Sequence, residues 1–299
     1  MRIDPYSLEL FLATAREGSI ARAAKREHIA PSALSRRIAD LEVAIGLPLL
    51  VRSPSGVELT EAGRHAFVRA TRLHDDLQSL ARDVQSLSGQ VSGVVRLFAN
   101  ASAVVGFLPE RLMSFQAAYP LVEIALDERI SDDVLRACLE DRADVGVCAA
   151  PASVPAGIES RHFADDPLMV VLPPGHELAD ADRLSFSDVV RFPLVALQAG
   201  GSLDQLLKER ADAAHGSLRI SVTVNSFDAQ CRMVEAGLGI GIVPTSAASA
   251  FAGTRNFVRR PLDEPWGQRE LCVYALRKSP RLKAVQALIE HLGHLRDEG

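Results

Sequence analysis

Residues 18–42 read GSIARAAKREHIAPSALSRRIADLE, and they carry the strongest structural signals in the first part of the chain. Ser19 is a favourable N-cap for a short helix, which the segment 28–30 ends. Pro31 suits the first turn of a second helix, because an N–H at that position would have no helical partner. The sequence therefore predicts two short helices joined by a tight turn.

The second helix has one apolar face and one polar face. Leu34, Ile38 and Leu41 recur at spacings of four and three, so we expect them to be buried. The opposite face carries Ser32, Ser35, Arg36 and Arg37. An exposed Ser/Arg face on the second of two short helices is typical of a helix-turn-helix whose recognition helix contacts DNA. An ordinary helical hairpin with a solvated basic face is the alternative.

The next stretch, residues 46–63, reads GLPLLVRSPSGVELTEAG. Two short apolar runs flank the turn at residues 53–56, which predicts a small hairpin, or wing. Thr60 then caps a long helix, with Glu61 favourably placed in its first turn. The order of these elements favours a winged helix-turn-helix over a simple helical hairpin.

With the wing in place, the chain resembles the LysR-type transcriptional regulators, and the resemblance runs along its whole length. The family pattern is A-A-x-x-L-x-x-[ST]-x-[PS]-A-[LV]-S-x-x-I-x-x-L-E-x-x-[LI]-G-x-x-L-[FL]-x-R, followed by L-T-x-A-G. The matching positions here are Ala23, Ala24, Ala33, Leu34, Ser35, Ile38, Leu41, Glu42, Gly46, Leu49, Arg52, Leu59, Thr60, Ala62 and Gly63. The resemblance implies an all-α winged helix-turn-helix domain at 1–59, a linker and dimerisation helix at 60–90, and an effector-binding domain at 91–299.

The resemblance and the exposed face together give a set of DNA-binding candidates. They are Arg22, Pro31, Ser32, Ala33, Ser35, Arg36, Arg37 and Arg52. Three positions depart from the family. Glu27 replaces a usually buried Leu, Ala30 replaces the usual Ser/Thr cap, and Ser55 stands where many members carry a wing Arg. We expect the missing cap to cost the helix about 1 kcal/mol.

The composition is typical of a globular protein with more than one domain. The 299 residues are 47% hydrophobic and 24% charged, with a net charge of −5. Residues 1–92 carry a net charge of +1 and the remainder −6, so only local clusters of basic residues favour DNA. No apolar run reaches the roughly 18 residues of a membrane helix, and no signal region is evident, so we expect a cytoplasmic protein without membrane contact.

The helix from Thr60 to about Ser88 carries an apolar stripe over three heptads. Its positions are Ala66, Phe67, Ala70, Leu73, Leu77, Leu80, Ala81, Val84 and Leu87. A stripe this long beside so small a domain favours pairing with a second copy. The family resemblance implies a homodimer that assembles further into a homotetramer.

After a Ser/Gly-rich linker, strands alternate with helices, which predicts parallel α/β sheets. We expect strands at 94–98, 122–126, 145–148, 168–172, 194–197, 218–224, 240–243 and 271–275. We expect helices at 102–119, restarting or kinking at Pro109, and at 132–140, 202–214, 227–236 and 282–295. By resemblance these form two Rossmann-like lobes of a periplasmic-binding-protein-like sensor. Lobe I would comprise 94–162 and 268–299, and lobe II 163–267.

Ligands in open α/β sheets bind beyond the carboxyl ends of strands, where helix N-termini favour anions. Small polar residues follow several of the predicted strands, and we expect Ser131 to end the second strand of lobe I. The effector-binding candidates are Asn100, Ser102, Ser131, Gln198, Gly201, Ser202, Asn225, Ser226 and Phe227. Arg129 would add charge at the rim. Each residue alone is more simply a helix cap, and their convergence on one cleft is implied by the family fold. A small anionic effector is the expected ligand.

Other functional classes have weaker support. The chain has no G-x-S-x-G, P-loop, G-x-G-x-x-G or H-E-x-x-H motif, so we expect no catalytic residues and no enzyme activity. We also expect no cofactor and no metal, because Cys138, Cys148, Cys231 and Cys272 are scattered without a C-x-x-C. A thiol switch using Cys138 and Cys148 stays open as an alternative, as does a solute-binding protein, although residues 18–63 argue against the latter.

Overall fold

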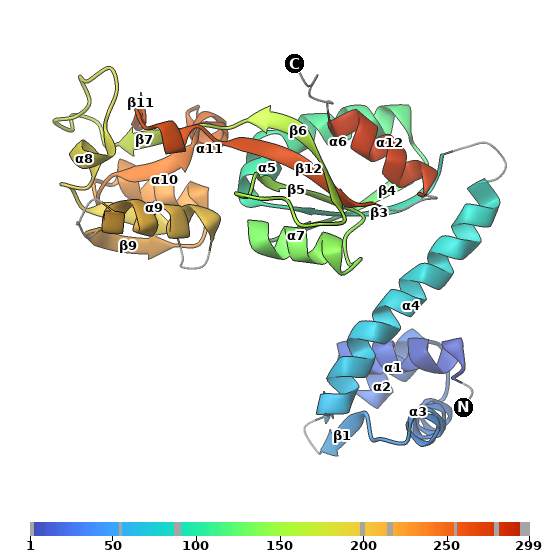
Figure 1. Cartoon of the computed structure of the whole chain (residues 1–299). Helices are drawn as coiled ribbons and strands as arrows, with labels where there is room; N and C mark the ends of the chain where they lie inside the picture. The colour runs from blue at the N-terminus through green and yellow to red at the C-terminus, as the bar shows by residue number, and fades with distance from the viewer. Residues whose placement is uncertain are drawn as a thin grey trace. The chain divides into compact units, whose positions relative to one another are not determined.

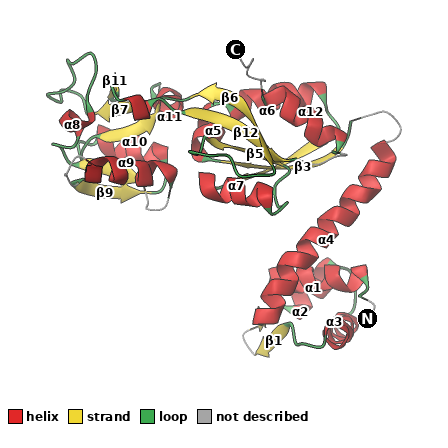
Figure 2. Ribbon diagram, in the orientation of Figure 1, coloured by secondary structure: helices red, strands yellow, loops and turns green. Residues whose placement is uncertain are grey.

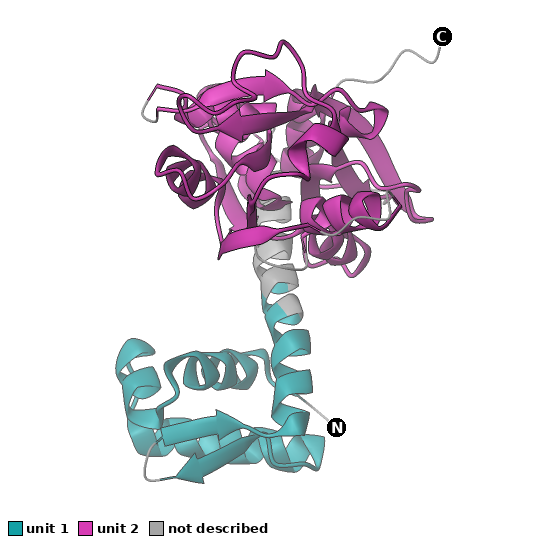
Figure 3. Ribbon diagram, turned by 90° about the vertical axis from the view of Figure 1, so that its left-hand side faces the viewer, with its two compact units in different colours: residues 1–90 teal, residues 91–299 magenta. Residues whose placement is uncertain are grey.

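The computed structural model describes residues 3–53, 56–86, 91–197, 201–213, 218–253, 256–277 and 281–293. The chain divides into two compact units, Met1–Gln90 and Val91–Gly299, each with its own hydrophobic core (Figure 3). Within these ranges no helix is both long and apolar enough to cross a membrane.

Unit 1 is a small helical domain with a two-stranded hairpin. Its elements are α1 (Pro5–Glu17), α2 (Ile20–Arg26), α3 (Pro31–Ile45), β1 (Leu50–Ser53), β2 (Gly56–Leu59) and α4 (Glu61–Ser86) (Figure 1). Ser19 caps α2 as predicted, because its hydroxyl accepts the N–H of Arg22. Leu34, Ile38 and Leu41 are buried in the core. The predicted helix-turn-helix is confirmed.

The turn between α2 and α3 tolerates the departures from the family pattern. Ala30 makes no capping bond, and Pro31 fills the first turn of α3. His28 adopts a left-handed conformation with φ 55°. Glu27 is half-buried and faces Arg26, whose Nε lies 3.7 Å from its carboxylate. Glu27 thus takes part in an ion pair, and its backbone N–H donates to the carbonyl of Ala23 at 2.9 Å at the end of α2.

The predicted wing forms and is fastened to its neighbours. Strands β1 and β2 pair antiparallel from Leu50 opposite Leu59 to Ser53 opposite Gly56. The carboxylate Oε1 of Glu42, on α3, accepts the backbone N–H groups of Leu49 at 2.7 Å and Leu50 at 3.1 Å. One half-buried carboxylate thus connects α3 to the first strand of the wing. Ser55 lies outside the described residues.

Helix α4 starts at its predicted cap. The hydroxyl of Thr60 accepts the N–H of Gly63 at 2.8 Å, and a Cβ at Gly63 would lie only 2.0 Å from the carbonyl oxygen of Leu49. This close approach requires glycine. Further along, Leu73 and Leu77 are 52% and 45% exposed. The stripe from Leu80 onward lies outside the described side chains.

Lobe I of unit 2 is built on a five-stranded mixed sheet. Its strands are β3 (Gly93–Ala99), β4 (Val122–Glu128), β5 (Val145–Ala149), β6 (Ile158–Asp165) and β12 (Glu270–Leu276), in the order β4-β3-β5-β12-β6. Its helices are α5 (Ala101–Gly106), α6 (Leu108–Ala118), α7 (Ser131–Leu139) and α12 (Lys283–Leu292). Helices α6 and α12 cover one face and α7 the other (Figure 1). Pro109 stands in the first turn of α6, which confirms the predicted restart.

Lobe II holds two smaller sheets. Its strands are β7 (Leu168–Leu172), β8 (Leu194–Leu197), β9 (Ile220–Val224), β10 (Gly241–Pro244) and β11 (Val258–Pro261). Its helices are α8 (Phe186–Val189), α9 (Ser202–Ala213), α10 (Phe227–Glu235) and α11 (Thr245–Phe251), and a short 3₁₀ helix covers Pro265–Gly267. Strands β8 and β9 pair parallel, whereas β10-β7-β11 is antiparallel. An isolated bridge between Leu194 and Ile240 joins the two sheets.

Two lobes with α/β texture were predicted, and that architecture is confirmed (Figure 2). The expectation of wholly parallel sheets was wrong. Strand β12 runs antiparallel to both β5 and β6, and β7 runs antiparallel to both its neighbours. Strand β6 leads out of lobe I and β12 leads back into it, so these two neighbouring strands run in opposite directions. Strands β6 and β11 and helices α8 and α11 were not anticipated.

The lobes also touch through two helices. A Cβ added to Gly106, at the end of α5, would lie 2.2 Å from the Cβ of Ser246 on α11. Ser246 in turn donates its backbone N–H at 3.0 Å and its hydroxyl at 3.1 Å to the carboxylate of Asp166, in the first crossing. Asp166 is fully buried, and burial raises its pKa while the bonds from Ser246 oppose that shift. Close packing and a buried carboxylate therefore define the joint between the lobes.

Candidate functional site

The polar face of α3 is accessible, as its sequence indicated. Pro31, Ser32, Ala33 and Arg36 are exposed, and Ser35 is half-buried. Within the described part of unit 1, Arg36 makes no ion pair or side-chain hydrogen bond. Its guanidinium is therefore available to a base edge or a phosphate.

The other predicted arginines are anchored within unit 1. Nη1 of Arg37 lies 2.9 Å from Oδ2 of Asp4, and its guanidinium lies 5.2 Å from the ring centre of Tyr6. The hydroxyl of Ser7, with a smaller contribution from Arg37, lowers the pKa of Asp4. Arg22 donates to the carbonyl of Glu17. These residues are still about half exposed or more, but their heads are held toward α1.

Arg52 connects the wing with the recognition helix. Its Nη1 donates to the hydroxyl of Ser35 at 2.7 Å. Both residues belong to the predicted set, and their contact brings the wing strand β1 against the polar face of α3. The structure thus gathers Ser32, Ser35, Arg36 and Arg52 on one surface of unit 1.

A second candidate site is a cavity of about 290 Å³ between the lobes of unit 2. Seven of the predicted effector-binding residues line it, and they come from both lobes. These are Asn100, Ser102, Ser131, Gly201, Ser202, Asn225 and Phe227. We call this cavity the interlobe cleft.

A chain of hydrogen bonds crosses the interlobe cleft. Nδ2 of Asn100 donates to the hydroxyl of Ser131 at 3.3 Å, and that hydroxyl lies 3.3 Å from the hydroxyl of Ser202 on α9. Oδ1 of Asn100 also accepts the N–H of Ala103 and so caps α5. Ser131 is the first residue of α7, not the end of a strand as predicted. The helix starts α5, α7 and α9 therefore meet at the cleft.

Two predicted residues stand apart from this group. Ser226 does not line the cleft, because its hydroxyl accepts the N–H of Ala229 as the N-cap of α10 and its side chain is exposed. Gln198 lies outside the described residues.

Charged residues line the cleft as well. Arg129 does so, as predicted, with Nη2 2.7 Å from Oδ2 of Asp127. Glu128 and Arg269 were not anticipated. Nη1 of Arg269 is buried and has no hydrogen-bond partner among the described residues. Burial lowers the pKa of Arg269, and Asp166 partly opposes this. No sequence signal pointed to Arg269, because it lies in the second crossing and not after a predicted strand.

The cysteines are buried thiols. All four are buried and form no disulfide within the described part of the chain, and Cys138, Cys148 and Cys272 lie in one apolar cluster with Tyr274. Burial, and then the nearby Asp144, raises the pKa of Cys138 to about 12, and burial also raises the pKa of Cys148. A thiol in this state is a poor nucleophile, because the thiolate is the reactive form.

One group of described residues has the spacing for a metal ion. The ligand atoms of His162, Asp165 and Glu270 lie within 4.8 Å of one another. The side chain of Asp165 is 79% exposed and pairs with His162 at 3.0 Å. An exposed ion pair beside a second carboxylate accounts for this arrangement.

Comparison with known proteins places both parts of the chain. Residues 6–64 match the model of the bacterial regulatory helix-turn-helix proteins of the lysR family, and residues 88–296 match the LysR substrate binding domain. The chain is 28% identical over 258 residues to the RuBisCO operon transcriptional regulator of Allochromatium vinosum, covering 86% of this chain and 85% of that protein.

Two solved structures share the fold. Full-length CbnR in complex with its target DNA matches with a TM-score of 0.76 at 22% identity, over 97% of this chain and 99% of that one. A variant of full-length OxyR from Pseudomonas aeruginosa matches with a TM-score of 0.71 at 20% identity, over 98% and 95% of the two chains.

Proposed function

Because this chain belongs to the LysR family of DNA-binding transcriptional regulators with an effector-binding domain, we propose which of its surfaces read DNA and which bind the effector. The recognition helix α3 and the wing contact the operator, and a small anion binds in the interlobe cleft. The observation that carries the second assignment is the buried Nη1 of Arg269, which has no hydrogen-bond partner among the residues that the structure describes, in a cleft lined by serine residues.

At the DNA surface the candidates take different roles. Arg36, which has no partner in the described part of unit 1, reads a base edge in the major groove. Pro31, Ser32 and Ala33 lie at the exposed start of α3, where backbone N–H groups favour a phosphate. Four further residues contribute supporting contacts to the DNA: Arg22, Ser35, Arg37 and Arg52. Arg22 already donates a hydrogen bond within unit 1, and Arg37 already forms an ion pair there. Their role is therefore to position unit 1 on the phosphate backbone of the DNA.

In the interlobe cleft, we expect the ligand to bind at Arg269. A carboxylate or another small anion would accept from Nη1 of Arg269 and from the hydroxyls of Ser102 and Ser202. Charge-assisted hydrogen bonds of this kind are roughly twice as strong as neutral ones. Asn100, Ser131, Gly201, Asn225 and Phe227 shape the remaining wall. We retain Gln198 as a candidate by its position in sequence and regard Ser226 as a cap of α10.

We assign the regions as follows: 1–59 to DNA binding, 60–90 to the linker and dimerisation helix, and 91–299 to effector binding, with lobe I at 94–162 and 268–299 and lobe II at 163–267. Leu73 and Leu77 are large apolar residues exposed on α4, which supports dimerisation through this helix. CbnR, which shares this fold, was solved bound to its target DNA. We expect this chain to bind DNA as a homodimer or homotetramer, as the family resemblance implies. Acting on the bacterial chromosome, the protein would work in the cytoplasm.

The alternatives fit less well. A thiol switch requires an accessible cysteine with a lowered pKa, whereas Cys138 and Cys148 are buried and their pKa values are raised. A solute-binding protein would leave unit 1 without a role. We also propose that the chain has no enzyme activity, because members of this family act as regulators.

The effector assignment is tested by thermal shift on the full-length protein. A panel of small mono- and dicarboxylates is compared with the corresponding neutral amides, since a ligand that binds only the folded state raises the melting temperature. We expect at least one carboxylate to raise it and its amide to fail. Arg269→Met should lose the shift and Arg277→Met, an exposed arginine outside the cleft, should keep it. Equal shifts by acid and amide, or no shift by any acid, would contradict the assignment.

A further inference from the structure

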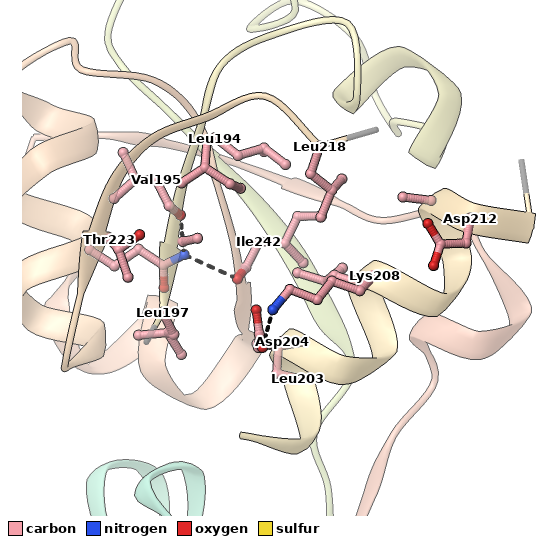
Figure 4. Close-up of a pocket in the computed structure, with 15 residues that line it drawn as sticks. Leu194, Val195, Leu197, Leu203, Asp204, Lys208, Asp212, Leu218, Thr223 and Ile242 are labelled. Carbon is pink, nitrogen blue, oxygen red and sulfur yellow. Dashed lines mark hydrogen bonds and ion pairs between the residues drawn. The ribbon is translucent and has the colours of Figure 1, made fainter. Parts of the chain in front are cut away.

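A second cavity, of about 300 Å³, lies inside lobe II between α9 and the strands β8, β9 and β10 (Figure 4). We call it the lobe II cavity. Leu197 and Leu203 line both this cavity and the interlobe cleft, so they form a common wall. The volume is far larger than the voids that close packing normally leaves in a protein interior. It falls in the range of small-molecule sites.

The walls are aliphatic. Leu194, Leu197, Leu203, Leu218 and Ile242 surround the space in Figure 4, and Leu207 and Ala211 of α9 continue the apolar surface. An apolar molecule gains by leaving water for such a surface. The cavity therefore accommodates a mainly apolar ligand.

One polar side chain in the wall, that of Gln230, has a hydrogen-bond acceptor without a donor among the described residues. Gln230 of α10 is 2% exposed, and its Nε2 donates to the carbonyls of Val195 at 2.7 Å and Ile242 at 3.5 Å. These carbonyls fix the amide orientation, because exchanging its oxygen and nitrogen would place oxygen against oxygen. Oε1 of Gln230 is then left buried with no hydrogen-bond partner among the described residues. An O–H or N–H donor on a ligand would satisfy it.

The charges beside the cavity are mostly negative. Asp204 and Lys208, one helical turn apart on α9, form an ion pair of 2.8 Å, and Asp212 lies on the next turn (Figure 4). The charge of Lys208 is therefore balanced by Asp204, and the remaining charged residue, Asp212, is acidic. This rim disfavours an anion, in contrast to the interlobe cleft with Arg269.

From these features we propose that lobe II contains a second binding site, for a neutral and mainly apolar molecule with one O–H or N–H donor directed at Oε1 of Gln230. The volume suits a ligand on the order of ten non-hydrogen atoms. The proposal does not depend on the identity of the effector in the interlobe cleft.

The test is calorimetric titration of the full-length protein with three probes that share a 4-propylphenyl body and differ in their polar group. 4-Propylphenol is neutral near pH 7 and carries a donor, 4-propylanisole lacks the donor, and 4-propylbenzoate is an anion. We expect the phenol to bind about tenfold more tightly than the anisole, the typical effect of one buried hydrogen bond. The benzoate should bind more weakly than both.

Two variants locate the probe. In Gln230→Met, of similar size and without the acceptor, the phenol should lose its advantage and bind as weakly as the anisole. Leu207→Trp should fill the cavity and abolish binding of both probes, whereas Gln205→Trp, exposed on the same helix outside the lining, should bind both normally. If Leu207→Trp does not fold, the Gln230→Met comparison decides by itself, because a general loss of structure would weaken both probes equally.

Several outcomes would overturn the proposal. They are no phenol binding at millimolar concentrations, equal affinity for phenol and anisole in the natural chain, or an undiminished phenol advantage in Gln230→Met. Loss of phenol binding in Ser102→Leu would place the probe in the interlobe cleft and would also refute a separate site.

Discussion

Gly106→Ala should wedge the two lobes of unit 2 apart. The added Cβ would lie 2.2 Å from the Cβ of Ser246 and 2.8 Å from its hydroxyl oxygen. Carbon atoms in ordinary contact are about 3.5–4.0 Å apart, so α5 and α11 must separate by about 1.5 Å. Ser102 lies one turn earlier on α5, and the movement would shift it within the interlobe cleft.

The expected cost follows from two opposing effects. Overpacking of this kind typically costs about 1–3 kcal/mol. Alanine in place of glycine in a helix returns up to about 1 kcal/mol. The Cβ of Ser246 cannot move away without its helix, so we take the upper part of the overpacking range, about 2–3 kcal/mol. Subtracting the helix gain of about 1 kcal/mol leaves a net destabilisation of about 1–2 kcal/mol, which lowers the melting temperature of a unit of this size by about 2–8 °C.

Thermal unfolding of the full-length protein measures this effect, and a second substitution isolates its cause. Ser246→Gly removes the two nearest atoms, Cβ and Oγ, and leaves only the Cα of residue 246, at 3.2 Å, so Gly106→Ala should cost much less in that background. Gly253→Ala, where nothing lies within 4 Å, is the matched control and should leave stability unchanged or slightly raised. An equal cost of Gly106→Ala in both backgrounds, or no cost in either, would refute the role of this contact.

Three further predictions concern other parts of the chain. Arg36→Ala should weaken binding to a specific duplex by about 1–3 kcal/mol and reduce discrimination against random DNA, and unchanged affinity on both duplexes in a binding titration would rule out a DNA contact. Leu73→Asp combined with Leu77→Asp should yield smaller species in sedimentation, because a dimer seam would bury two unpaired charges, and a folded assembly of natural size would argue that these residues lie outside the seam. Asp166→Asn tests a pH effect: since burial raises the folded pKa of Asp166 above 3.8, its contribution to stability is full below pH 3.8 and is lost as the pH rises through the folded value. The free energy of unfolding of the natural chain should therefore fall relative to the variant over that window, and parallel curves would contradict the assignment.

The sequence predicted unit 1 well because its signals are local. Ser19, Pro31 and Thr60 mark helix starts within a few residues, and the spacing of Leu34 and Ile38 sets the buried face. These determinants act over one or two helical turns and need no knowledge of distant contacts.

Sheet direction in unit 2 could not be obtained in the same way. Strand β12 pairs with β6 more than a hundred residues away, and only the return crossing of the chain makes that pairing antiparallel. The segment of β6 mixes charged and apolar residues without clean alternation, so it gave no strand signal. Pairing depends on the tertiary path, which local patterns do not contain.

The residues of the interlobe cleft also fall into two groups: those that local sequence signals identify, and those that depend on the tertiary path of the chain. Asn100, Ser102 and Ser202 follow strand ends or start helices, and general rules for α/β sheets identified them. Arg269 belongs to a crossing segment, and its place in the cleft results from how the lobes meet. Its buried Nη1 became visible only with coordinates.

The carboxylate of Glu42 has a consequence for how operators are chosen. By holding the N–H groups of Leu49 and Leu50, it fixes the separation between the recognition helix and the wing. If the separation between the recognition helix and the wing is fixed, the protein cannot adapt to the local width of the double helix. The duplex would then have to bend or change its groove width to contact the recognition helix and the wing at once. Base steps that never touch the protein would then influence affinity through their stiffness. Elastic bending of a DNA site costs on the order of a few kcal/mol, and the cost depends on the sequence that is bent. Two operators with identical contacted bases would differ in occupancy according to the flexibility of the bases between them.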